Sequence, residues 1–203
     1  DIKRLPATSV KDQHRSGTCW SFSGLSFIES EMMRMGKPEV DLSDMFVVYN
    51  CYSDKAIKHV RMNGHFNFGG GGAFHDVTYV LKNYGIVPEN VYEGLNYGES
   101  GHTHGELDAI LKDYVTAVIK NKNRKITPVW HKGFDGVLDA YLGETPEKFE
   151  YEGKEYTPKS FAKDFVGVNA DDYIEISSYT HHPFYEKFII EVPDNWLWDE
   201  VYN

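Results

Sequence analysis

The sequence predicts an α+β protein that is mostly helical in its first part and begins a β-structure near its end. Large apolar residues recur at three- and four-residue steps from Trp20 to Met35, as one face of a helix requires. Runs of aromatic and β-branched residues at 173–177 and 188–192 indicate strands instead. The 203 residues suffice for a substantial hydrophobic core.

The composition excludes several classes of protein. The chain is 41% hydrophobic and 15% aromatic, which is not the composition of a disordered chain. Its 31 acidic and 21 basic residues give a net charge of −10, which disfavours a nucleic-acid partner. No run approaches the roughly 20 apolar residues that cross a bilayer, so we expect no membrane span. Because the chain begins at Asp1 and not at Met, we expect that a preceding segment was removed, which leaves export open.

Two helices are expected in the first part of the chain. The first runs from Cys19 to Met35 and ends at Gly36, with Pro38 just beyond. The second begins near Ser43, whose hydroxyl can cap free N–H groups of the first turn. Its polar end, residues 54–61, is expected to fade into a loop.

A glycine-rich loop at residues 62–72 follows these helices. It ends in four glycines, and no Lys-Ser or Lys-Thr follows them, which argues against a phosphate-binding loop. The remaining expected elements are helices at 73–84, stopped by Gly85, and at 106–121, a hairpin at 146–157 around Glu152-Gly153, and a short helix at 157–165.

The segment that carries chemistry reads Gln13-His14-Arg15-Ser16-Gly17-Thr18-Cys19-Trp20-Ser21-Phe22-Ser23. It places Cys19 in the first turn of a helix, where unpaired N–H groups and the helix dipole favour the thiolate. The thiolate is the nucleophilic form, so this location suits acyl transfer. The Gln13 side-chain amide can donate a hydrogen bond to a developing oxyanion, and the backbone N–H at Cys19 can donate a second.

This segment resembles the papain superfamily, whose local signature is C-G-[SA]-C-[WY]. Here the signature reads Ser16-Gly17-Thr18-Cys19-Trp20. Ser16 replaces a cysteine that forms a disulfide in secreted members, and Thr18 replaces a small residue. Because that cysteine is lost while the rest of the motif is kept, the chain is similar to the bleomycin hydrolase and aminopeptidase C branch, peptidase family C1B.

The resemblance is good from residue 5 to residue 97. Asp41-Leu42-Ser43-Asp44 matches the segment that opens the family's second helix, and Tyr92 matches a tyrosine after its Ile-x-x-Glu turn. Gly71 and Gly72 match a Gly-Gly pair whose backbone, by this resemblance, binds the substrate as a short strand. Ala73 and Phe74 then fall beside a specificity pocket.

The resemblance implies the papain-like cysteine proteinase fold, mainly its helical half plus the start of its β half. We assign residues 1–100 to the helical half with the nucleophile. Residues 101–170 form an inserted helical and hairpin segment, and residues 171–203 form the first strands of an incomplete β half.

The partner of the nucleophile is missing from the sequence. Peptidases of this kind need a His as general base and acid, oriented by an Asn. None of the nine histidines has the family's flanking pattern, and Asn195-Trp196 lacks the Ser of Asn-Ser-Trp. We therefore expect the catalytic His and Asn in a C-terminal half beyond Asn203, encoded by the same gene or present as a second chain.

Several residues keep other interpretations. Cys19 could be a buried structural thiol, Cys51 is expected to be one, and a disulfide between them is formally allowed. His102-x-His104 and His181-His182 could ligate a metal, but they lack a Cys or carboxylate partner at a usual spacing, so we expect solvated loop histidines. We expect no metal and no cofactor.

The predicted activity is thiol-dependent hydrolysis of a peptide substrate through an acyl-enzyme at Cys19, with Gln13 stabilising the oxyanion. The resemblance implies a cytoplasmic aminopeptidase that forms a homo-oligomer, since members of that branch assemble as hexamers. A papain-like endopeptidase stays open as an alternative. So does a non-catalytic papain-like module that binds peptides, because no catalytic His is found in the chain.

Overall fold

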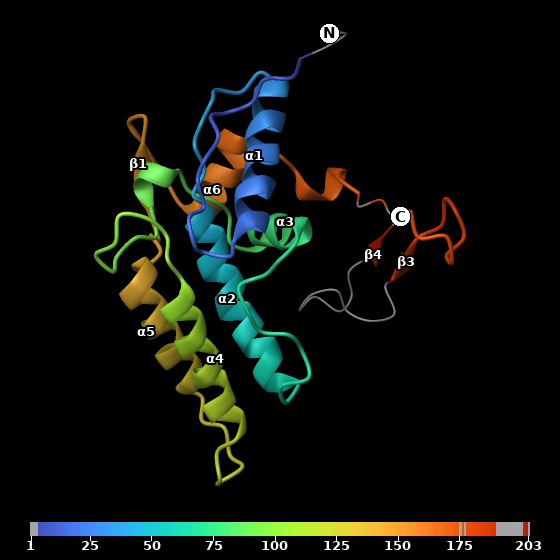
Figure 1. The fold of residues 1–203 in the computed structure, drawn as a ribbon. Coiled ribbons are helices and arrows are strands. Elements are labelled where there is room, and N and C mark those ends of the chain that lie inside the picture. The colour runs from blue at the N-terminus through green and yellow to red at the C-terminus, as the bar shows by residue number, and fades with distance from the viewer. Residues whose placement is uncertain (1–3, 175, 177, 190–200, 203) are drawn as a thin grey trace.

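The structure is a computed structural model that describes residues 4–174, 176, 178–189 and 201–202. Helices are its main regular structure and the strands are short, which confirms the expected α+β content (Figure 1). In chain order the elements are α1 (Cys19–Arg34), α2 (Asp44–Arg61), α3 (Phe74–Asn83), η1 (Glu89–Val91), α4 (Gly105–Ile119), α5 (Trp130–Leu142), β1 (Phe149–Tyr151), β2 (Lys154–Tyr156), α6 (Pro158–Ser160), η2 (Phe161–Val166), η3 (Ala170–Asp172), β3 (Phe188–Ile189) and β4 (Val201–Tyr202).

Helix α2 lies at the centre of the helical part. Helices α1 and α3 pack on it, and so do α4 and α5, which form an antiparallel pair (Figure 1). One cluster of buried apolar side chains runs from Trp20 in α1 to Val168 after η2, and it includes residues of all these helices. The segment 101–170 therefore shares its hydrophobic core with the first hundred residues.

Helices α1 and α3 approach each other closely at Gly24. A Cβ atom at this position would lie 2.6 Å from the Cγ2 atom of Val77, well inside van der Waals contact. The absence of a side chain at Gly24 is therefore a condition for this helix pair.

Two expectations about helices were wrong. Residues 54–61 belong to α2, because Lys55, Ala56, His59 and Val60 are buried at a helical spacing and hold the last turns against the core. Helix α5 was not expected at all. Its side chains Phe134, Leu138 and Leu142 recur every fourth residue and are fully or almost fully buried, which is what stabilises the helix.

The expected hairpin is confirmed. Strand β1 pairs antiparallel with β2, with Phe149 opposite Tyr156, and Glu152 and Gly153 form the turn with φ values of +50° and +76°. This is the conformation of a two-residue turn that matches the twist of the strands. The expected short helix is also present, as α6 followed by the π-helical η2.

The strands expected near the end are found in part. Residues 188–189 form β3, which pairs antiparallel with β4, whereas residues 190–192 lie outside the described part of the chain. Residues 173, 174 and 176 are not in a strand, and 175 and 177 are not described.

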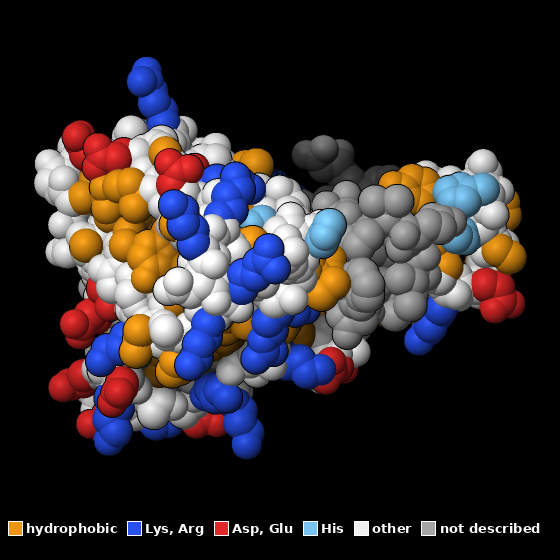
Figure 2. Space-filling view, turned by 90° about the horizontal axis from the view of Figure 1, so that it is seen from below, with side chains coloured by type: hydrophobic (Ala, Val, Ile, Leu, Met, Phe, Trp, Pro, Cys, Tyr) orange, Lys and Arg blue, Asp and Glu red, His pale blue; other side chains and the backbone are white. Residues whose placement is uncertain are grey.

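Charge is unevenly spread over the surface. Figure 2 shows many Lys and Arg side chains on the face seen from below, with Asp and Glu side chains toward its edge. The exposed basic residues that directly follow α4 are Lys120, Lys122, Arg124 and Lys125. Within the described residues, none of the helices combines the length and apolarity that a membrane crossing needs.

Candidate active site

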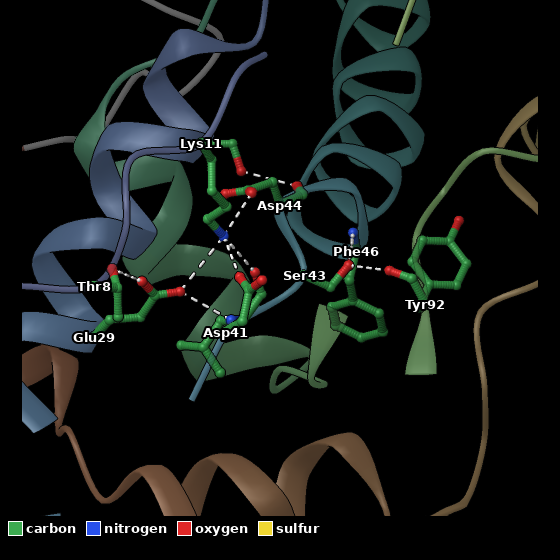
Figure 3. Close-up of polar contacts among 10 residues, drawn as sticks. Thr8, Lys11, Glu29, Asp41, Ser43, Asp44, Phe46 and Tyr92 are labelled. Carbon is green, nitrogen blue, oxygen red and sulfur yellow. Dashed lines mark hydrogen bonds and ion pairs between the residues drawn. The ribbon is translucent and has the colours of Figure 1, made fainter. Parts of the chain in front are cut away.

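A polar cluster around Lys11 fixes the extended segment that leads to the nucleophile loop (Figure 3). The Lys11 ammonium lies 2.7 Å from Asp41 Oδ1 and 2.9 Å from Asp44 Oδ2. The buried Glu29 of α1 accepts hydrogen bonds from the Thr8 hydroxyl, at 2.6 Å, and from the Leu42 backbone N–H, at 2.9 Å. These contacts join residues 8–11 to α1 and to the start of α2.

Acidic groups outnumber Lys11 in this cluster. Burial raises the pKa of Asp44 to about 6 even though Lys11 lies against it. Burial, and then repulsion from Asp44, raises the pKa of Glu89 to about 8. Burial alone would lower the pKa of Lys11, but Asp44 and the other carboxylates outweigh it and raise that pKa above its ordinary value. The cluster therefore favours a protonated Glu89 at neutral pH.

The nucleophile loop is a tight turn with its own hydrogen bonds. The Ser16 N–H donates to the Gln13 carbonyl at 3.3 Å, and the buried hydroxyls of Ser16 and Thr18 are 2.5 Å apart. Gly17 adopts φ +69°, a conformation that favours glycine. Ser16 thus stabilises the loop through a hydrogen bond with Thr18.

Cys19 is the first residue of α1 and is an exposed free thiol. The first helical hydrogen bonds are donated by Ser21 and Phe22 to the Thr18 carbonyl, so the N–H groups of Cys19 and Trp20 precede them. Cys51 is fully buried in α2 and is also a free thiol. A buried Cys19 and a Cys19–Cys51 disulfide are therefore both wrong, whereas the expectation of a buried Cys51 is confirmed.

Residues 101–104 pack along the nucleophile loop. The Arg15 N–H donates to the His102 carbonyl at 2.8 Å, and the His104 N–H donates to the Arg15 carbonyl at 3.1 Å. His104 is fully buried, and burial, reinforced by repulsion from His102, lowers its pKa to about 4. The expectation of a solvated histidine is wrong at His104, because pairing with Arg15 carries this residue into the core.

Within the described residues, no group of three or more His, Cys, Asp or Glu side chains is arranged to hold a metal ion. In the second histidine pair, His181 is exposed and His182 is half-buried.

The glycine loop lies on the nucleophile helix. The Trp20 Nε1–H donates to the Gly70 carbonyl at 2.9 Å. A Cβ atom at Gly72 would lie 2.5 Å from the Trp20 ring, whereas one at Gly71 would meet no atom within 4 Å. The residue next to Cys19 thus supports the loop that contains the predicted substrate-binding glycines.

The other predicted site residues lie close to these. Ala73 caps α3, and its N–H donates to Asp76 Oδ2 at 2.8 Å. Phe74 is half-buried and its ring packs edge to face on Phe27 of α1, with 5.2 Å between ring centroids. Gln13 is half-buried on the loop before Cys19. Its bond to an oxyanion stays a prediction, as do the substrate contacts of Ala73 and Phe74.

Lys55 was missed by the sequence reasoning. It lies on the buried face of α2, and its ammonium donates to the Gly71 carbonyl and, at 3.5 Å, to the Gly69 carbonyl. The available signal was its position among residues at helical spacing, Tyr52, Ala56 and His59, which all face the core.

Residues 1–141 match the family model described as papain family cysteine protease. The chain belongs to the papain family of cysteine proteases. Within this family the resemblance to the aminopeptidase branch is confirmed. Aminopeptidase G of Lactobacillus delbrueckii subsp. lactis is 24% identical over 94% of this chain and 52% of its own length.

Two further proteins also match, one over a shorter part of the chain and one over nearly all of it. Cathepsin K of Gallus gallus is 34% identical over 46% of this chain and 25% of its own length. The crystal structure of PepW from Lactobacillus rhamnosis HN001 aligns with a TM-score of 0.64 and 21% identity, over 92% of this chain and 50% of that one. The likeness confirms the papain-like α+β fold. This papain-family chain spans about half the length of the aminopeptidases that it matches.

Proposed function

We propose that Cys19 is the nucleophile of a peptidase that acts on the N-terminal residue of peptides. The observation that carries this proposal is an exposed free thiol at the first turn of α1, next to the tryptophan that supports the glycine loop. Membership of the papain family supports a peptidase, and similarity to aminopeptidases over nearly the whole chain supports the aminopeptidase type.

In the proposed reaction, the peptide lies extended along the backbone of Gly71 and Gly72. The Cys19 thiolate attacks the carbonyl carbon of the scissile bond, and the oxyanion accepts hydrogen bonds from the Cys19 N–H and the Gln13 amide. The intermediate expels the amine, which takes a proton from the catalytic His, and leaves a thioester. Water, deprotonated by the same His, then releases the carboxylate and the thiolate.

We propose that the His and its Asn lie outside these 203 residues. None of the described contacts brings a histidine to Cys19 as a hydrogen-bond or ion-pair partner, and the relatives extend over about twice this length. Tests of activity therefore require the intact gene product.

The test compares the two cysteines of the chain. Cys19→Ala should abolish hydrolysis of a peptide amide with a free N-terminus, and Cys51→Ala, the matched control, should retain it. Iodoacetamide should label Cys19 faster than it labels a free model thiol. Hydrolysis that survives Cys19→Ala would refute the proposal.

A substrate panel decides the type of peptidase. Peptides with free N-termini should be cleaved, and the same peptides with acetylated N-termini should not. Cleavage of the acetylated set would favour the endopeptidase alternative. Peptide binding without turnover would favour the non-catalytic module.

A further inference from the structure

Lys55 is a cation almost completely enclosed by the protein. Only 1% of its surface is exposed, although lysine is among the residues that are rarely buried. It lies on the buried face of α2, and its side-chain nitrogen points to the glycine loop. Burying an ammonium group is costly unless its donors are used, so its partners indicate what it does.

Lys55 contacts the glycine loop and the aromatic rings beside it, and its charge also interacts with the carboxylate of Asp108 on α4. Its Nζ donates to the carbonyls of Gly71 and Gly69, and it lies 5.5 Å from the centroid of the Trp20 ring and 5.8 Å from that of Tyr52. The Trp20 indole donates to the carbonyl between these two, that of Gly70. Three consecutive carbonyl groups are thus turned toward the protein and held by two side chains.

Glycines cannot hold this loop by themselves. Gly69, Gly70, Gly71 and Gly72 have no side chains to pack, and glycine loses more backbone freedom on ordering than any other residue. An ammonium group offers three donors and can bind several carbonyls at once. The bonds from Lys55 and Trp20 therefore supply the order that the sequence of the loop lacks.

The other side of the loop is left open. A Cβ atom at Gly71 would meet nothing within 4 Å. A loop tied down by its carbonyls on one side and free on the other has the form that an extended peptide needs for main-chain pairing.

We infer that Lys55 is a positioning residue. By binding the Gly69 and Gly71 carbonyls it holds Gly71 and Gly72, the substrate-binding ledge, in place, and it joins this ledge to Trp20, the neighbour of the nucleophile. The inference rests on the proposed function, because it assigns Lys55 to the binding of peptide substrates. Lys55 acts through the ledge and does not contact the reacting atoms.

The test uses Lys55→Met in the intact gene product. Met keeps the length and apolar stem but removes the charge and all three donors. The matched control is Lys112→Met, because Lys112 is exposed and donates to the Phe68 carbonyl at 3.2 Å, in the same loop but outside the ledge. For each protein we would measure kcat and KM with a free N-terminal peptide, and inactivation rates with iodoacetamide and with a peptidyl epoxysuccinate.

Lys55→Met should raise KM by about tenfold, the effect of losing a hydrogen bond to a charged group, while kcat changes little. Inactivation by the peptidyl epoxysuccinate should slow by a similar factor, because that reagent needs the ledge. Inactivation by iodoacetamide, which does not, should stay close to the wild-type rate. Lys112→Met should behave as wild type in all four measurements.

Unchanged KM and unchanged epoxysuccinate inactivation in a folded Lys55→Met protein would overturn the inference. If that variant does not fold, Lys55→Gln decides, since it lacks the charge and its side chain is too short to bind both carbonyls. A selective rise in its KM supports the inference, and a wild-type KM overturns it. Failure of the proposed function is distinguishable, because wild-type protein would then neither cleave peptides nor be inactivated by the peptidyl reagent.

Discussion

Glu89 is a carboxyl group with too few favourable partners. It begins η1, one of its carboxyl oxygens is buried without a hydrogen-bond partner, and Asp44 and Asp41 repel its charge. Burial is the main reason that its pKa rises from about 4.5 to about 8. The turn at residues 86–89 pairs with residues 41–43 through two backbone hydrogen bonds. The Ser43 N–H donates to the Val87 carbonyl, and the Glu89 N–H donates to the Asp41 carbonyl. Ionisation of Glu89 therefore destabilises the segment that leads into α2.

Glu89 predicts a pH dependence of stability with a definite sign. Between pH 4.5 and pH 8 the folded state keeps a proton that the unfolded state has released, so this group's contribution is lost as the pH rises. In the Glu89→Gln variant, the side chain at this position cannot ionise. Relative to wild type, its free energy of unfolding should therefore increase steadily from pH 5 to pH 8.

The measurement is urea unfolding at pH 5, 6.5 and 8. Glu150→Gln, a change at an exposed glutamate of β1, serves as the control and should follow the wild-type curve. Parallel curves for wild type and Glu89→Gln would contradict the prediction.

At the scale of elements, the loop at residues 62–72 has two kinds of glycine. Gly72 packs on Trp20 and Asp76 and has no room for a Cβ atom. Gly69 and Gly71 have open space where a Cβ atom would stand. Only Gly71 belongs to the pair predicted to bind the substrate, so Gly69 and Gly71 can be compared directly.

Gly71→Ala should leave stability unchanged but weaken substrate binding. The added methyl group meets no atom of the protein, whereas a peptide paired with the ledge would have to accommodate it. We expect KM for a free N-terminal peptide to rise by about tenfold, because fitting an extra methyl group into a packed contact costs about 1–3 kcal/mol. Gly69→Ala should keep both the melting temperature and KM of wild type. Equal KM values for the two variants would place the substrate elsewhere.

Elements with strong local signals could be predicted from the sequence. The turn residues Glu152-Gly153 fixed the hairpin, and the Ser43 hydroxyl caps α2 by accepting from the Phe46 N–H at 3.0 Å. Helix α5 could not be found so easily, because Gly133 and Gly136 lower its intrinsic propensity and its stability comes from packing. The last turns of α2 were missed because the polar residues at 54–61 were expected to form a loop.

The candidate site was predictable to a similar degree. Cys19 and Gln13 are predicted from a local motif, and the role of the Gly71-Gly72 pair from the family resemblance, and neither prediction needs tertiary contacts. Lys55 depends on the contact between α2 and a loop more than ten residues later, and the burial of His104 depends on pairing with Arg15. Contacts of this kind are absent from any local pattern.

At the scale of the whole molecule, residues 101–170, which were predicted to be an inserted segment, belong to the main core. Phe134 of α5 is fully buried and packs edge to face on Phe68 of the glycine loop and Tyr114 of α4. Because α4 and α5 both pack on α2, loss of packing at α5 should also destabilise α2, the helix that carries Lys55.

Phe134→Ala should lower the free energy of unfolding by about 3–5 kcal/mol, the usual cost of removing a buried phenylalanine ring. Hydrogen exchange should speed up in α1 and α2 as well as in α5, because one core is weakened. Val129→Ala, at a residue that is 67% exposed just before α5, is the control and should change neither quantity. Faster exchange confined to residues 101–170 would show that the insertion unfolds independently.

The close approach of α1 and α3 at Gly24 bears on how substrate selectivity could change in such a protein. Helix α1 carries Cys19, and α3 begins two residues after Gly72, so the separation of these helices affects the distance from thiol to ledge. A side chain at position 24 would meet Val77 and force the helices apart. In the proposed function, this would move Cys19 and the glycine ledge apart although the residues on both sides stayed the same. If the proposed function holds, a substitution at this helix contact would alter selectivity without changing a residue of the proposed peptide site.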